Sequence, residues 1–100
     1  MPGTREFEVR PNEYEEFRFS LSRRTEVRIT MIATETINIL ILDNDQMYEY
    51  ERGELSTHEF TAVWNGRVRL DTNITLGAGT WHLIVEGHKE KSKGTIILFP

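Results

Sequence analysis

Three histidines and one acidic stretch are the residues of this chain whose types could carry chemistry. His58, His82 and His88 have spacings that match no metal-binding motif, so we expect them to be exposed or half-exposed. Asp43-Asn44-Asp45 begins like a calcium loop. However, Met47 stands at the fifth position of that loop and no glycine stands at the sixth. The pattern therefore favours helix capping over a metal site.

Other catalytic arrangements are missing from the sequence as well. The chain has no cysteine, which excludes a thiolate nucleophile, a disulfide framework and cysteine-based zinc sites. No serine stands in a Gly-x-Ser-x-Gly elbow, and the glycines of Gly77-Ala78-Gly79 are explained by a turn that needs positive φ. We therefore predict a protein that is not an enzyme, with no catalytic residue, metal or cofactor.

The net charge of −4 is unevenly distributed, since residues 43–59 hold six acids against one arginine. Nucleic-acid binders usually present a basic surface, so we predict no nucleic-acid partner. A basic stripe would form only if the strands that carry the arginines were neighbours. Glutamates accompany these arginines, which favours a solvated charge ladder. The arginines concerned are Arg18, Arg23, Arg24, Arg28, Arg67 and Arg69.

The apolar runs are too short to cross a membrane. The longest are Ile39–Leu42 and Ile96–Phe99, four residues each, against the ~18–20 needed for a spanning helix. The first six residues contain no apolar h-region, so we expect no signal peptide. The chain as it stands would be cytoplasmic, or extracellular if it is a fragment of a longer protein; the compartment stays open.

The dominant hydrophobic period is two, which is the signal of β-strands with one apolar face. With 100 residues, the chain is expected to form a single domain over residues 1–100. Strands of five to nine residues with frequent turn signals predict an all-β, jelly-roll-like antiparallel sandwich of about eight strands. Asn65-Gly66 predicts a type I′ hairpin turn. Residues 36–42 and 95–99 are apolar on both strand faces, so they are central strands or are covered by a loop or a partner chain.

The expected core follows from the shared parity of apolar residues within each strand. Its members are Phe7, Phe17, Phe19, Val27, Ile29, Met31, Ile39, Ile41, Phe60, Val68, Leu70, Trp81, Leu83, Val85 and Ile97.

One short helical turn interrupts the strand pattern between Asp43 and Gly53 and should cross one end of the sandwich. Residues two apart on a helix face different ways, so we expect Tyr48 to plug the end of the core beside Met47 and Tyr50 to be exposed. Trp64 should be half-buried at the sandwich rim. Tyr50 and Trp64 are therefore the candidate ligand-binding residues.

Two stretches resemble a known family. The first is Asn38-Ile39-Leu40-Ile41-Leu42-Asp43-Asn44-Asp45-Gln46-Met47-Tyr48-Glu49-Tyr50-Glu51-Arg52-Gly53-Glu54, and the second is Ile74-Thr75-Leu76-Gly77-Ala78-Gly79-Thr80-Trp81-His82-Leu83-Ile84-Val85-Glu86-Gly87. Together they are similar to the bacterial and archaeal pre-peptidase C-terminal-like domains and their Golgi-dynamics-type jelly-roll relatives, over roughly residues 5–99. Gly77 replaces a usual proline, and Gly87 replaces a usual asparagine. The resemblance implies a non-catalytic accessory module with no universal ligand.

Three functions fit these observations. The first is a non-catalytic accessory binding or interaction module of unknown ligand. The second is a structural domain that self-associates weakly through a strand edge or through the two-sided apolar strands. The third is a small carbohydrate-binding module that uses exposed aromatic rings. The expected partner is therefore a protein or a second copy of the chain, with carbohydrate as a further possibility.

Because the acidic stretch lacks calcium-ligand spacing, calcium should have no structural role. Thermal unfolding curves recorded with millimolar calcium and with EDTA should superimpose. A shift of many degrees between the two curves would mean that the acidic stretch binds the ion.

Overall fold

Six strands and one helix make up the described part of the chain, residues 3–54 and 60–99 of a computed structural model. In chain order they are β1 (Gly3–Val9), β2 (Tyr14–Leu21), β3 (Thr25–Leu42), α1 (Asn44–Glu51), β4 (Ala62–Leu76), β5 (Gly79–Gly87) and β6 (Ser92–Phe99). The predicted all-β fold with one short helix is confirmed, but the predicted count of about eight strands is wrong. Among the described residues no helix is long and apolar enough to cross a membrane.

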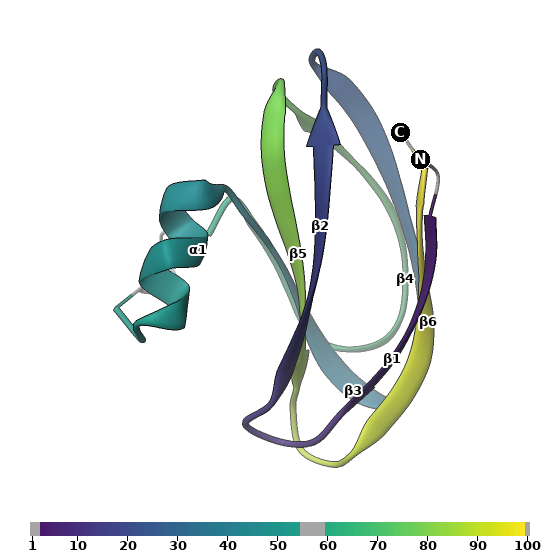
Figure 1. Cartoon of the computed structure of the whole chain (residues 1–100). Helices are drawn as coiled ribbons and strands as arrows, with labels where there is room; N and C mark the ends of the chain where they lie inside the picture. The colour runs from purple at the N-terminus through teal and green to yellow at the C-terminus, as the bar shows by residue number, and fades with distance from the viewer. Residues whose placement is uncertain (1–2, 55–59, 100) are drawn as a thin grey trace.

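The strand count differs because two long strands each serve both layers of the sandwich (Figure 1). β3 pairs with β4 along one edge, whereas its other edge pairs first with β6 and then with β5. β1 pairs with the free edge of β6, and β2 pairs with the free edge of β5. Layer 1 comprises β1, β6, the first half of β3 and the second half of β4. Layer 2 comprises β2, β5 and the other halves of β3 and β4.

β3 and β4 bend where they pass from one layer to the other. The register between them shifts after Ile32 and resumes at Ile37. The predicted hairpin at Asn65-Gly66 is wrong, because both residues lie inside β4. Gly66 has a φ of 64°, and its amide donates to Asn38 Oδ1 at 2.9 Å, so the glycine serves a bend within a continuous strand.

The predicted core is largely confirmed. Ten of its members are buried: Phe7, Phe19, Val27, Ile29, Met31, Ile39, Ile41, Leu70, Leu83 and Val85. Phe17 and Trp81 are partly buried against this core, while Phe60 packs on a second apolar cluster beneath α1.

Two core assignments are wrong. Val68 is 42% exposed, because it lies at the bend of β4 and has no partner in the β3 register. Ile97 faces outward and is only partly buried. Its neighbours Ile96 and Leu98 are buried instead, because they lie opposite the inward-facing Met31 and Ile29.

The helix α1 has the predicted caps but not the predicted location. Asp43 is its N-cap, with Gln46 completing a capping box, and Gly53 follows the last turn with a φ of 70°. Instead of crossing an end of the sandwich, α1 covers the outer face of layer 2, where an apolar cluster of Leu40, Leu42, Met47 and Ile84 is buried. Covering this patch removes it from water.

The predicted roles of the two helix tyrosines are reversed. Tyr48 is 62% exposed, and its ring lies 5.3 Å from the Arg52 guanidinium carbon. Tyr50 is partly buried against the cluster beneath α1. The helical period explains this result, because Tyr50 stands three residues after Met47 and shares its face.

The apolar side chains on which the prediction of self-association rested are covered within the chain. Leu40, Leu42, Ile96 and Leu98 are all at most 5% exposed, so the argument that these two-sided strands need a second copy is wrong. α1 and the opposite layer of the sandwich provide the cover.

Replacing Met47 by Ala should lower the free energy of unfolding by about 2–5 kcal/mol, because it leaves a cavity between α1 and layer 2. Tyr48→Ala is the matched control and should cost less than about 1 kcal/mol, because this side chain is exposed. Urea unfolding measures both. Equal costs for the two variants would contradict the described orientation of α1.

Candidate functional site

A small pocket of about 260 Å³ lies where α1, β2 and the end of β5 meet, and two tyrosines form part of its wall. The Tyr14 and Tyr50 ring centroids are 5.1 Å apart, and the planes meet at 76°, which is an edge-to-face arrangement. The remaining lining residues are Asn12, Glu13, Glu86 and Gly87. Tyr14 is 43% exposed, so an aromatic ring is available to a ligand beside two carboxylates.

Glu86 holds the inner wall of this pocket together. Tyr14 on β2 and Asn38 on β3 are its two register neighbours. The Tyr50 hydroxyl donates to one Glu86 carboxylate oxygen at 2.5 Å, and Asn38 Nδ2 donates to the other at 3.1 Å. Burial raises the pKa of the Tyr50 phenol above its usual range, and the Glu86 carboxylate raises it further. Tyr50 therefore stays a protonated donor at neutral pH.

The floor of the pocket is a tight contact between the β1–β2 turn and the end of β5. The Gly87 amide donates to the Glu13 carbonyl oxygen at 2.9 Å. A Cβ at Gly87 would lie 1.9 Å from the Arg10 carbonyl oxygen, so only glycine fits there. Asn12 adopts a φ of 70° in the same turn. These constraints fix the loop that carries Glu13 and leads into Tyr14.

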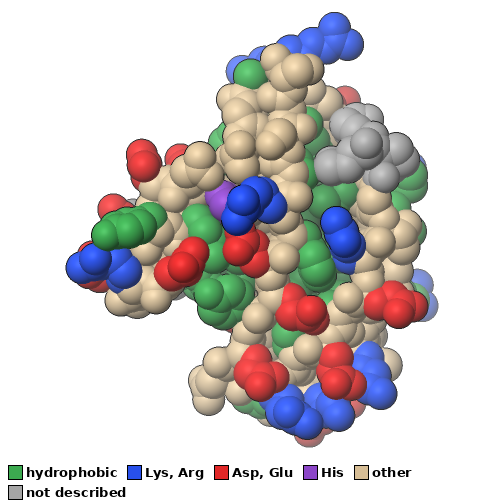
Figure 2. All heavy atoms as spheres, in the orientation of Figure 1, with side chains coloured by type: hydrophobic (Ala, Val, Ile, Leu, Met, Phe, Trp, Pro, Cys, Tyr) green, Lys and Arg blue, Asp and Glu red, His purple; other side chains and the backbone are tan. Residues whose placement is uncertain are grey.

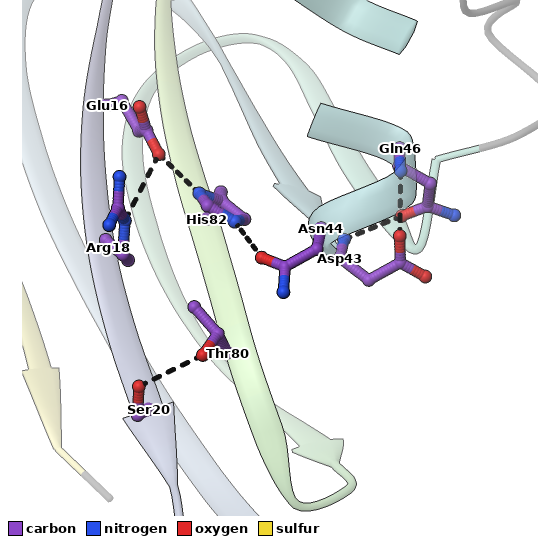
Figure 3. A network of polar contacts seen from close by, with 8 residues as sticks. All are labelled: Glu16, Arg18, Ser20, Asp43, Asn44, Gln46, Thr80 and His82. Atoms are coloured by element: carbon purple, nitrogen blue, oxygen red, sulfur yellow. Dashed lines mark hydrogen bonds and ion pairs between the residues drawn. The ribbon is translucent and has the colours of Figure 1, made fainter. Parts of the chain in front are cut away.

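A second polar network ties the start of α1 to layer 2 (Figure 3). His82 on β5 is 5% exposed; its Nδ1 bonds the Glu16 carboxylate, and its Nε2 lies 2.7 Å from Asn44 Oδ1. Arg18 lies 3.9 Å from the same Glu16 carboxylate. The prediction of an exposed or half-exposed His82 is wrong, because α1 covers this face. His88 is half-exposed as predicted, and His58 lies outside the described residues.

The His82 side chain is held by its neighbours on both sides of the ring. Both ring nitrogens of His82 already face oxygen atoms. The hydroxyl groups of Ser20 and Thr80 are 3.3 Å apart and bond each other (Figure 3), and among the described residues no hydroxyl group bonds the His82 ring. Over residues 3–54 and 60–99, no group of three or more acidic or histidine side chains could hold a metal ion. The geometry fits a structural role for His82.

The two predicted site residues are not brought together. Tyr50 lines the pocket on the outer face of layer 2. Trp64 lies on the opposite face of that layer, packed against the main core. The sequence analysis did not identify Tyr14. The signal that could have identified it is an aromatic residue on the polar face of β2.

The six arginines do not form one stripe, because Arg18 lies on β2, which is a neighbour of neither β3 nor β4. Arg28 instead makes two 2.9 Å bonds to the Asp71 carboxylate across β3 and β4. Acidic and basic side chains are interspersed over the face shown in Figure 2. This mixture gives no single-sign field on that face.

Solved structures share this fold. No protein-family model matches the sequence, and no curated protein matches it. The pre-peptidase C-terminal domain of a collagenase from Bacillus anthracis matches with a TM-score of 0.72, over 99% of this chain and 90% of that one, at 8% sequence identity. This match confirms the fold that the sequence resemblance implied.

The bond between Tyr50 and Glu86 should make stability depend on pH in the alkaline range. Because folding raises the pKa of Tyr50, its contribution is complete below the unfolded-state pKa of ~10 and is lost as the pH rises further. Tyr50→Phe should therefore cost about 1–3 kcal/mol at pH 7, and the difference from wild type should narrow above pH 10.

Chemical denaturation between pH 7 and 11.5 measures this difference. Tyr48→Phe is the matched control, because its hydroxyl accepts a bond from Arg52 and does not contact Glu86. If both variants follow the same pH course, the assigned role of the Tyr50–Glu86 bond is wrong.

Proposed function

We propose that this chain is a non-catalytic accessory module that binds an extended polymer through the Tyr14–Tyr50 pocket. The observation that carries the proposal is the fold shared with an accessory domain of a collagenase, an enzyme named for a polymeric substrate. Fold alone does not specify function, so the site must supply the rest of the argument. The His82 ring, whose two nitrogens already face Glu16 and Asn44, supports a binding role over a catalytic one.

The pocket supports polymer binding through its mixture of groups. The Tyr14 ring offers a rigid, partly exposed apolar face that costs little entropy to hold. Glu13 and Glu86 offer carboxylate acceptors, and among the described residues neither forms an ion pair with a basic side chain. The Tyr14 ring is 43% exposed, so a segment within a long chain could reach it without a free end.

A carbohydrate polymer is the second candidate. Sugar rings present apolar faces beside hydroxyl donors, and the pocket places the Tyr14 ring next to the Asn12 amide and two carboxylates. Trp64 does not contribute under this proposal, because it belongs to the core face of the sheet.

Retention on insoluble polymers tests the proposal. The chain is incubated with fibrous collagen, chitin and cellulose, and the bound fraction is measured for wild type, Tyr14→Ala and Tyr48→Ala. We expect binding to one of these polymers and at least about tenfold weaker binding by Tyr14→Ala, the scale of losing an aromatic anchor. Tyr48→Ala removes an even more exposed ring outside the pocket and should bind like wild type.

Two results would contradict the proposal. One is the absence of retention on any of the three polymers. The other is an equal loss in Tyr14→Ala and Tyr48→Ala, which would place the contact surface on exposed rings in general and not in the pocket.

A further inference from the structure

The outer edge of β4 is open along a long strand. Among the described strands only β3 pairs with β4, although β4 runs over Ala62–Leu76. On the β1 edge, by contrast, the Glu8 amide already donates to the Glu15 carboxylate at 2.8 Å. An open edge presents backbone donors and acceptors that can pair with another strand.

The side chains along this edge are self-complementary in charge. Arg69 and Asp71 are both exposed and share the outer face of layer 1. Asp71 is held by Arg28 through two 2.9 Å bonds, whereas Arg69 makes no ion pair among the described residues. Val68, beside Arg69, leaves 42% of its surface exposed. The edge therefore has an unpaired cation, a fixed anion and an uncovered apolar group within four residues.

We propose that β4 pairs antiparallel with β4 of a second copy about a twofold axis through Leu70. Side chains alternate between strand faces, so an axis that keeps the inner faces together must pass through a residue. An axis at Arg69 or Asp71 would place a like charge opposite itself. An axis at Leu70 places Arg69 opposite Asp71 of the second copy, and this pair occurs twice.

The same register covers the exposed apolar group. Val68 falls opposite Thr72 of the second copy, on the inner face where Leu70 also lies. Asp71 then lies between Arg28 of its own chain and Arg69 of the second copy. Layer 1 of each copy joins into one continuous sheet, and the Tyr14–Tyr50 pocket is absent from the contact because it lies at α1, β2 and β5.

Charge reversal and mixing test the register. Sedimentation velocity is run on wild type, Arg69→Asp and Asp71→Arg, with circular dichroism melts to show that each is folded. Each substitution places like charges opposite each other twice, so it should raise the dimer Kd at least about tenfold. Mixing the two variants restores both attractive pairs, so the mixture should form a heterodimer that neither variant forms with itself.

Arg5→Asp and Glu6→Arg are the matched controls, because they make the same charge changes at exposed sites of β1, which does not pair with β3 or β4, and should dimerise like wild type. A wild-type chain that stays monomeric at concentrations on the order of 1 mM would overturn the proposal. So would a dimer that survives both β4 substitutions, or a mixture that stays monomeric while both variants are folded.

A cross-link gives a second test that leaves Asp71 intact. Because the chain has no cysteine, Val68→Cys/Thr72→Cys should form an intermolecular disulfide on oxidation. Within one chain these positions are four residues apart on an extended strand, too far to bridge. Val68→Cys alone should not cross-link. A cross-link formed by Thr72→Cys alone would place the axis at Thr72 and overturn the proposed register.

Discussion

The structure depends on one buried hydroxyl that fixes the bend of β3. Ser92 is fully buried; its Oγ accepts from the Glu35 amide at 3.1 Å and donates to the Glu35 carbonyl at 2.7 Å. Both groups lie where the β3–β4 register is interrupted, so the ladder does not satisfy them and a side chain must. Two residues later, a Cβ at Gly94 would lie 2.2 Å from the Ile32 carbonyl oxygen, so β6 can approach the bend only with glycine there. The bend lets one strand build two layers.

The candidate pocket follows from this bend. Beyond it, β3 pairs with β5 and brings Asn38 opposite Glu86. The outer face of the same segment is apolar at Leu40, which requires the cover that α1 supplies. Because Met47 is buried, Tyr50, which follows it by three residues on the same helix face, also points toward layer 2 and lies within hydrogen-bonding distance of Glu86. The polar contact at the pocket is therefore positioned by packing beneath the helix.

Local patterns predicted the strands, most of the core and the helix caps, because parity and capping chemistry act between near neighbours. They failed at the bends. The polar run Thr34-Glu35-Thr36 interrupts the apolar alternation, so one long strand had the pattern of two, and Asn65-Gly66 had the pattern of a turn although it bends a continuous strand. The pocket could be predicted only in part. Tyr50 was named as a candidate, but its partner Glu86 is 36 residues away in sequence. Its neighbour Tyr14 reaches the pocket through the pairing of β2 with β5, which no local pattern specifies.

Amide hydrogen exchange of Ser92→Ala tests most directly whether both layers depend on the bend. The variant leaves the Glu35 amide and carbonyl without their side-chain partner, at a cost of about 1–3 kcal/mol. We expect faster exchange in both halves of β3, over residues 25–33 and 37–42, because the two layers share this strand. Ser20→Ala, which removes an exposed hydroxyl bonded to Thr80, should leave both halves unchanged. Faster exchange confined to residues 34–36 of Ser92→Ala would contradict the account.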